Sequence, residues 1–243
     1  MATDPCEAIA AAAVHLATRI SAGGSLWVTA PGLEDHARHF AVEFVHPASV
    51  GAAAVPATAV TGSPDEIFLA LRRHVRPCDV VVSVGSEGSG FANELSVRSL
   101  AWGVDHLHIG WSRDQSVSHL NPSSFRIWLG SSETAEQLVT RTYHLLWELT
   151  FICMQMNRRS QENQPSARRP ESDQLPGESC AVCSDEALVC EVQSLPGESL
   201  ATVRNACGTQ VVDVSLLDNV RAYDLVLAHA GTAIRHLTVG TPS

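Results

Sequence analysis

Two thiols and one imidazole lie at opposite ends of the C-terminal part of the chain. Cys180 and Cys183 are spaced as Cys-x-x-Cys, and His229 lies near the end, in Val-Leu-Ala-His-Ala-Gly-Thr-Ala-Ile, residues 226–234. Thiolate and imidazole are ligands that suit iron or zinc. A Cys-x-x-Cys pair alone could be half of a zinc site or a redox pair. Because the sequence holds no second such pair, a structural zinc site with four ligands is not expected.

A second pair of candidate ligands lies in the N-terminal half. His39 and Glu43 are four residues apart in a predicted helix over residues 34–45, so both side chains lie on one helix face. The pair could hold a metal ion or work as an acid–base pair. The other interpretation is an ordinary surface or interface pair.

A glycine-rich loop follows a strand that consists almost entirely of valine. The strand covers residues 79–84, and the loop reads Gly-Ser-Glu-Gly-Ser-Gly. Such loops bind anions through backbone N–H groups and hydroxyls, and the alternative is a flexible turn between strand and helix. A carboxylate a few ångströms from a bound anion would cost about 1 to 4 kcal/mol, and Glu34, Asp35 and Glu87 are near the expected pocket. The candidate ligand-binding residues of the loop are Ser86, Glu87, Gly88 and Ser89.

Strands and helices alternate through the first part of the chain, which predicts an α/β domain over residues 1–156 with a doubly wound parallel sheet. Ligands in such folds bind at the carboxyl ends of the strands, here residues 30–35 and 85–90. The predicted helices are 7–21, 34–45, 65–75, 93–102 and 134–156, and the predicted strands are 26–30, 57–61, 79–84, 106–111 and 125–129.

A polar stretch without apolar periodicity, residues 157–177, predicts a linker that tethers a second module. That module covers residues 178–243 and is predicted to be a small, partly open, OB-like β-barrel. Its predicted strands are 187–194, 200–205, 210–214 and 225–229.

Composition excludes several classes of protein. The net charge is −10 and no basic patch is present, which argues against nucleic-acid binding. The nearest candidate for a membrane span, residues 145–156, is short and interrupted by Glu148, and no signal peptide is evident. Seven cysteines at irregular spacing indicate reduced thiols, and therefore a cytoplasmic protein.

The first domain resembles the sugar isomerase (SIS) fold, and within it the phosphoheptose isomerases. The similarity rests on His-Phe-Ala-Val-Glu-Phe-Val at 39–45, the valine strand with its loop, and Tyr-His-Leu-Leu-Trp-Glu-Leu at 143–149. It implies homo-oligomers and a zinc site that acts on a sugar phosphate. The positions that match this site are His39, Glu43 and His144, with Glu136 or Gln137 near a further one.

The second module resembles the HypC/HupF hydrogenase-assembly chaperones. The similarity rests on Val-Ser-Leu-Leu, Asp-Leu-Val-Leu and His-Ala-Gly-Thr-Ala-Ile, which follow one another within residues 211–234. It implies transient binding of an iron that carries cyanide and carbonyl ligands, by His229 and one cysteine. That cysteine is Cys183 by strand register, or Cys180 if the extra residues form a loop. The implied partners are a HypD-type protein and the [NiFe]-hydrogenase large subunit.

The sequence hypothesis is therefore a maturation chaperone rather than an enzyme. It would help to assemble or deliver the Fe(CN)2CO centre, with a degenerate SIS-like domain as scaffold or ligand sensor. The alternative is a phosphosugar isomerase or a sugar-phosphate-binding regulatory protein.

The chaperone hypothesis predicts that Cys180→Ala or Cys183→Ala abolishes hydrogenase maturation and bound iron, because a carrier needs a thiolate that can also release its metal. His229→Ala should do the same. The measurement is hydrogenase activity and iron content in a host that depends on this protein. Cys190→Ala and Cys207→Ala are the controls and should leave maturation intact. Normal maturation by both single cysteine variants and by their double variant would contradict the hypothesis.

Overall fold

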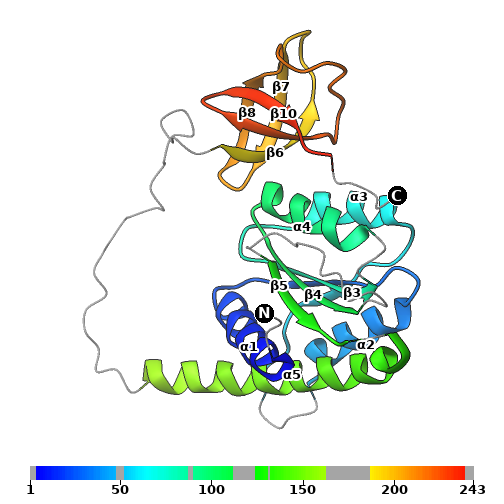
Figure 1. Cartoon of the computed structure of the whole chain (residues 1–243). Coiled ribbons are helices and arrows are strands. Elements are labelled where there is room, and N and C mark those ends of the chain that lie inside the picture. The colour runs from blue at the N-terminus through cyan, green and yellow to red at the C-terminus, as the bar shows by residue number, and fades with distance from the viewer. Residues whose placement is uncertain are drawn as a thin grey trace.

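The computed structural model describes residues 4–47, 52–86, 90–111, 124–130, 132–162 and 187–238. Two units are visible in Figure 1, a layered α/β domain and a small barrel that lies against one of its helical layers. Among these residues, no helix has both the length and the apolar character that a membrane span requires.

The first unit is built on a five-stranded sheet in which every pair of neighbouring strands is parallel. This confirms the predicted α/β class with a parallel sheet. The central strand β3 buries its valines on both faces, as expected for a strand covered from two sides. In spatial order the strands are β2 (Ala57–Ala59), β1 (Leu26–Thr29), β3 (Val80–Ser86), β4 (Asp105–Trp111) and β5 (Ser124–Trp128).

Helices cover the sheet on both faces (Figure 1). On one face lie α1 (Pro5–Ser21), α2 (Glu34–Val45) and α5 (Ser132–Glu162), which share one apolar core with the sheet. On the other face lie α3 (Pro64–His74) and α4 (Phe91–Trp102), which share a second core.

Local sequence signals explain how some helices begin and end. At the start of α3, the N-cap residue Ser63 and Glu66 form a capping box, and Pro64 between them is the first residue of the helix. Helix α5 differs from the prediction, because it continues through Glu162 and so includes the first residues of the predicted linker.

The second unit is a closed five-stranded barrel with the order β10-β8-β7-β6-β9. Its interior is a separate apolar cluster that includes Cys190, Val203 and Val226. The strands are β6 (Leu188–Ser194), β7 (Leu200–Asn205), β8 (Gly208–Asp213), β9 (Leu225–His229) and β10 (Thr232–His236).

The closure of the barrel corrects the prediction of a partly open one. The prediction missed β10, which pairs with β9 through a two-residue turn and with β8 to close the ring. Both turn residues, Ala230 and Gly231, have positive φ, at 47° and 82°. Such turns match the right-handed twist of the two strands that they join.

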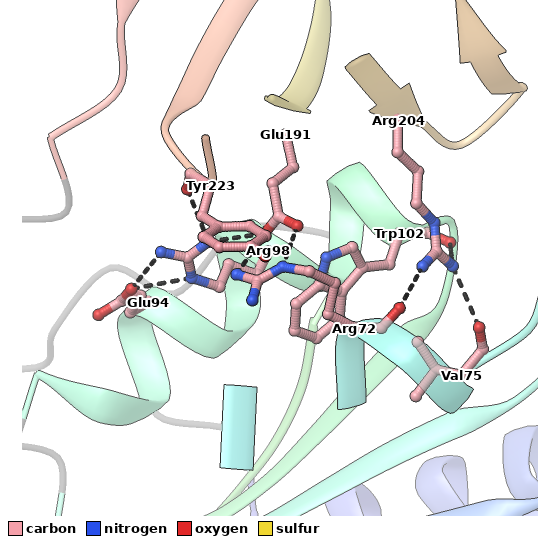
Figure 2. A network of polar contacts seen from close by, with 8 residues as sticks. All are labelled: Arg72, Val75, Glu94, Arg98, Trp102, Glu191, Arg204 and Tyr223. Carbon is pink, nitrogen blue, oxygen red and sulfur yellow. Dashed lines mark hydrogen bonds and ion pairs between the residues drawn. The ribbon is translucent and has the colours of Figure 1, made fainter. Parts of the chain in front are cut away.

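The barrel docks on α3 and α4 through a buried ionic cluster (Figure 2). Glu191 of β6 has no exposed surface, and both Arg72 of α3 and Arg98 of α4 bind its carboxylate. The Arg98 Nη1–Glu191 Oε2 distance is 2.6 Å. Tyr223 completes the cluster, because its ring stacks 4.0 Å from the Arg72 guanidinium and its carbonyl accepts a hydrogen bond from Arg98.

Arg204 of β7 makes a second docking contact. Its guanidinium donates to the carbonyls of Arg72, Val75 and Trp102, at the C-terminal ends of α3 and α4 (Figure 2). A cation is favourable where helix carbonyls lack partners. Next to it, Gly103 allows a close approach, since a Cβ there would lie 3.0 Å from the Ala206 backbone.

The buried cluster predicts that Glu191→Ala lowers the free energy of unfolding by about 3–5 kcal/mol, because it leaves the guanidinium of Arg72 without a carboxylate and that of Arg98 with Glu94 alone. Urea unfolding followed by tryptophan fluorescence measures this. Glu198→Ala is the matched control, since Glu198 is exposed in the same module, and should change stability by less than about 0.5 kcal/mol. Equal stability of the two variants would show that the cluster does not hold the modules together.

Candidate functional site

The packing of α2 against α5 brings three candidate ligands together. Helix α2 buries Phe40 and Phe44 on its inner face, and the Phe40 ring lies 5.6 Å from that of Tyr143 in α5. This contact leaves His39 and Glu43 at the margin of α2 beside His144 of α5. The predicted pairing of His39 with Glu43 and the proximity of His144 are both present in the structure.

The three side chains converge on one point. The Nε2 atoms of His39 and His144 are 3.4 Å apart, and each also faces Oε1 of Glu43, at 3.1 and 3.4 Å. Within the described part of the chain this is the one group of three or more such side chains able to share a metal ion. The side chains of His39 and His144 are each 45% exposed, so a ligand can reach them from solvent.

These separations fit a divalent metal. Zinc bound tetrahedrally by nitrogen and oxygen ligands at about 2.0–2.1 Å places those ligands about 3.3–3.4 Å from one another. Two histidines and one glutamate also form a known ligand set of catalytic zinc, which leaves a fourth position for water or substrate. The cluster therefore has the chemistry and the spacing of an open zinc site.

A tyrosine that the sequence analysis gave no role contacts the cluster from its buried side. The hydroxyl of Tyr143 lies 2.7 Å from Nδ1 of His39, and 3.3 Å from Oγ1 of Thr140. Burial raises the pKa of Tyr143, so the hydroxyl keeps its proton. One sequence feature could have indicated this role. Tyr143 is the neighbour of His144 in the sequence and lies three residues after Thr140, so Thr140 and Tyr143 share a helix face.

Other predicted residues of this domain are placed only in part. Glu136 lies in α5, but its side chain is outside the described residues, as are Glu87, Gly88 and Ser89 of the loop. Ser86 is the last residue of β3 and is exposed.

In the loop after β1, a carboxylate of the protein itself binds a backbone N–H group. Oε1 of Glu34 accepts a hydrogen bond from the backbone N–H of Gly32, at 3.0 Å. Asp35 instead points to solvent, where it pairs with Arg38. Glu34 therefore occupies one backbone N–H donor of this loop.

A third polar cluster is formed by side chains of the neighbouring strands β3 and β4. Oγ of Ser83 lies 2.8 Å from Nε2 of His106 and 2.8 Å from Nδ1 of His108, and all three side chains are buried. Burial is the main cause that lowers the pKa of both histidines, to about 4 for His108. The two imidazoles are therefore neutral near pH 7.

The predicted iron site in the second module is only partly described. His229 is the last residue of β9 and lies opposite Thr232 of β10. Cys180 and Cys183 lie outside the described residues, so their proximity to His229 stays a prediction. Cys190 is fully buried in the barrel, where burial raises the pKa of its thiol.

Comparisons with known proteins support only the first domain. No protein-family model matches the sequence, and no curated protein is similar to it. A phosphoheptose isomerase from Francisella tularensis superposes with a TM-score of 0.53 at 16% identity, over 60% of this chain and 86% of that one. The first domain has a phosphoheptose isomerase-like fold. This confirms the predicted SIS-like fold, whereas nothing supports the HypC/HupF resemblance of the second module.

Two further solved structures resemble the chain more distantly. One is the phosphoheptose isomerase GmhA from Neisseria gonorrhoeae, with 16% identity over 59% of this chain and 84% of that one, and a TM-score of 0.47. The other is the sugar isomerase domain of an RpiR transcription factor from Sphaerobacter thermophilus. It has 16% identity over 64% of this chain and 86% of that one, and a TM-score of 0.39.

The geometry of the cluster predicts that His39→Ala, Glu43→Gln and His144→Ala each weaken zinc binding at least about tenfold, because each removes one of three ligands. Titration calorimetry measures this in the full chain with Cys180→Ser and Cys183→Ser, so that the Cys-x-x-Cys pair does not compete for zinc. His46→Ala is the control, because His46 is exposed at the end of the same helix. If zinc binds equally to all four variants, the cluster is not a metal site.

Proposed function

We propose that this protein binds a phosphorylated sugar and that His39, Glu43 and His144, with a divalent metal ion, form the site that handles its carbonyl end. The observation that carries the proposal is the convergence of their three ligand atoms within 3.1–3.4 Å of one another. The phosphoheptose isomerase-like fold of the same domain supports it. The function belongs to the isomerase and sugar-phosphate-binding class rather than to iron delivery.

The chemistry expected of such a site is the interconversion of an aldose and a ketose. A proton leaves the carbon next to the carbonyl and returns to the former carbonyl carbon, while a hydroxyl proton moves to the carbonyl oxygen. A bound metal ion would polarise that oxygen. Glu43 faces both histidines with Oε1, which leaves Oε2 to take the carbon-bound proton and give it back as general base and acid.

One observation favours a sensor over a fast enzyme. Glu34 holds the Gly32 N–H in the loop after β1, at the end of the sheet where ligands of this fold class bind. A phosphate group that approaches this loop meets a carboxylate and one donor fewer. We therefore expect modest affinity for the phosphate end and slow turnover.

The proposal predicts that sedoheptulose 7-phosphate binds the zinc-loaded protein and that Glu43→Gln weakens binding at least about tenfold, because the metal and a proton acceptor are lost together. Calorimetry with and without zinc measures the binding, and proton exchange in NMR spectra of the sugar detects isomerisation. His46→Ala should bind like the unmodified chain. Absence of sugar-phosphate binding by zinc-loaded protein would refute the proposal.

A further inference from the structure

Tyr143 connects the candidate metal site to the interior of the domain. Its side chain is 1% exposed, and its ring lies edge-on to that of His39, with centroids 5.3 Å apart and planes 75° apart. Packing against Phe40 fixes the ring from the core side. The hydroxyl is thereby held between Nδ1 of His39, at 2.7 Å, and Oγ1 of Thr140, at 3.3 Å.

The hydrogen bond at Nδ1 of His39 determines whether Nε2 of the same ring carries a proton or a free lone pair. A neutral imidazole carries one proton, and the hydrogen bond at one nitrogen determines which nitrogen holds it. If the tyrosine hydroxyl donates to Nδ1, the proton of His39 is on Nε2, where Oε1 of Glu43 accepts it. In that tautomer Nε2 has no free lone pair and cannot bind a metal ion.

The same three side chains also allow the opposite arrangement. If Nδ1 carries the proton, it donates to the oxygen of Tyr143, whose own proton then points to Oγ1 of Thr140. Nε2 is left with a free lone pair beside Glu43 and His144. The number of protons on His39 and Tyr143 is the same in both arrangements.

We infer that Tyr143 is a positioning residue that selects the tautomer of His39, with its hydroxyl as donor to Nδ1 in the metal-free site and as acceptor from Nδ1 in the metal-loaded site. Oγ1 of Thr140 accepts the hydrogen bond of the tyrosine hydroxyl in the second arrangement. The inference rests on the metal site of the proposed function and assigns it a residue outside the ligand set. Outer partners of this kind commonly change metal affinity by about 10–100-fold when removed.

The test compares the same substitution at the two tyrosines of the chain. Tyr143→Phe keeps the buried ring but removes the hydroxyl, whereas Tyr223→Phe is the matched control at the barrel interface, far from the cluster. In the full chain with Cys180→Ser and Cys183→Ser, Tyr143→Phe should weaken zinc binding about 10–100-fold, with Tyr223→Phe unchanged. Equal zinc affinity of the two variants would overturn the inference.

A second readout follows the tautomer directly. Long-range nitrogen–proton NMR spectra of the histidine-labelled chain should show His39 with its proton on Nε2 without zinc and on Nδ1 with zinc. Tyr143→Phe should give a mixture of both tautomers without zinc. Thr140→Val should keep the metal-free tautomer but weaken zinc binding, because only the loaded arrangement uses Oγ1.

The two readouts separate failure of this inference from failure of the metal site. If the unmodified chain binds no zinc through His39, the proposed site fails, while the metal-free tautomer still tests the contact with Tyr143. A metal-free tautomer that is the same in Tyr143→Phe and in the unmodified chain overturns the inference, whatever the zinc affinity.

Discussion

A single carboxylate without exposed surface determines how the two halves of this protein fit together. Glu191 is bound by one arginine from α3 and one from α4, and neither arginine is more than 13% exposed. Burying three charges costs much of what their attraction returns, so the cluster is better understood as a constraint on the docking geometry than as a large source of stability. In the observed placement each of these charges has a partner, and Leu225 of the barrel is buried against α3 and α4.

This constraint changes the interpretation of the segment between the modules. A polar stretch without periodicity suggested a tether to a second module, and Arg204 and the Glu191 cluster show in addition that this module is fixed on the ends and faces of α3 and α4. Leu225 of the barrel even belongs to the same buried apolar cluster as these helices. The barrel is therefore a fixed layer of the molecule. A partner that binds the barrel meets it in a fixed position relative to the α/β domain.

The parts of the fold that follow from local patterns could be predicted from the sequence. The valine strand β3, the capped helix α3 and the face shared by His39 and Glu43 all depend on residues a few positions apart. The parts that were missed depend on distant partners. The burial of Glu191 requires an arginine 119 positions away, and β10 becomes a strand by closing a ring with β8. Tyr143 was given no role, because its contact with His39 comes from a helix packed across from it.

The candidate metal site and the barrel lie on opposite sides of the sheet, since α2 and α5 cover one face and α3 and α4 the other (Figure 1). Any influence of one on the other must therefore pass through the sheet or around its edge. Ser83 contacts His106 and His108 between β3 and β4, and burial lowers the pKa values of both histidines, so this cluster is uncharged near neutral pH. A closely packed layer transmits displacement of side chains. Coupling between sugar binding and the barrel, where it exists, would then depend on small shifts of β3 and of α4, which follows it in the chain and contacts Glu191 through Arg98.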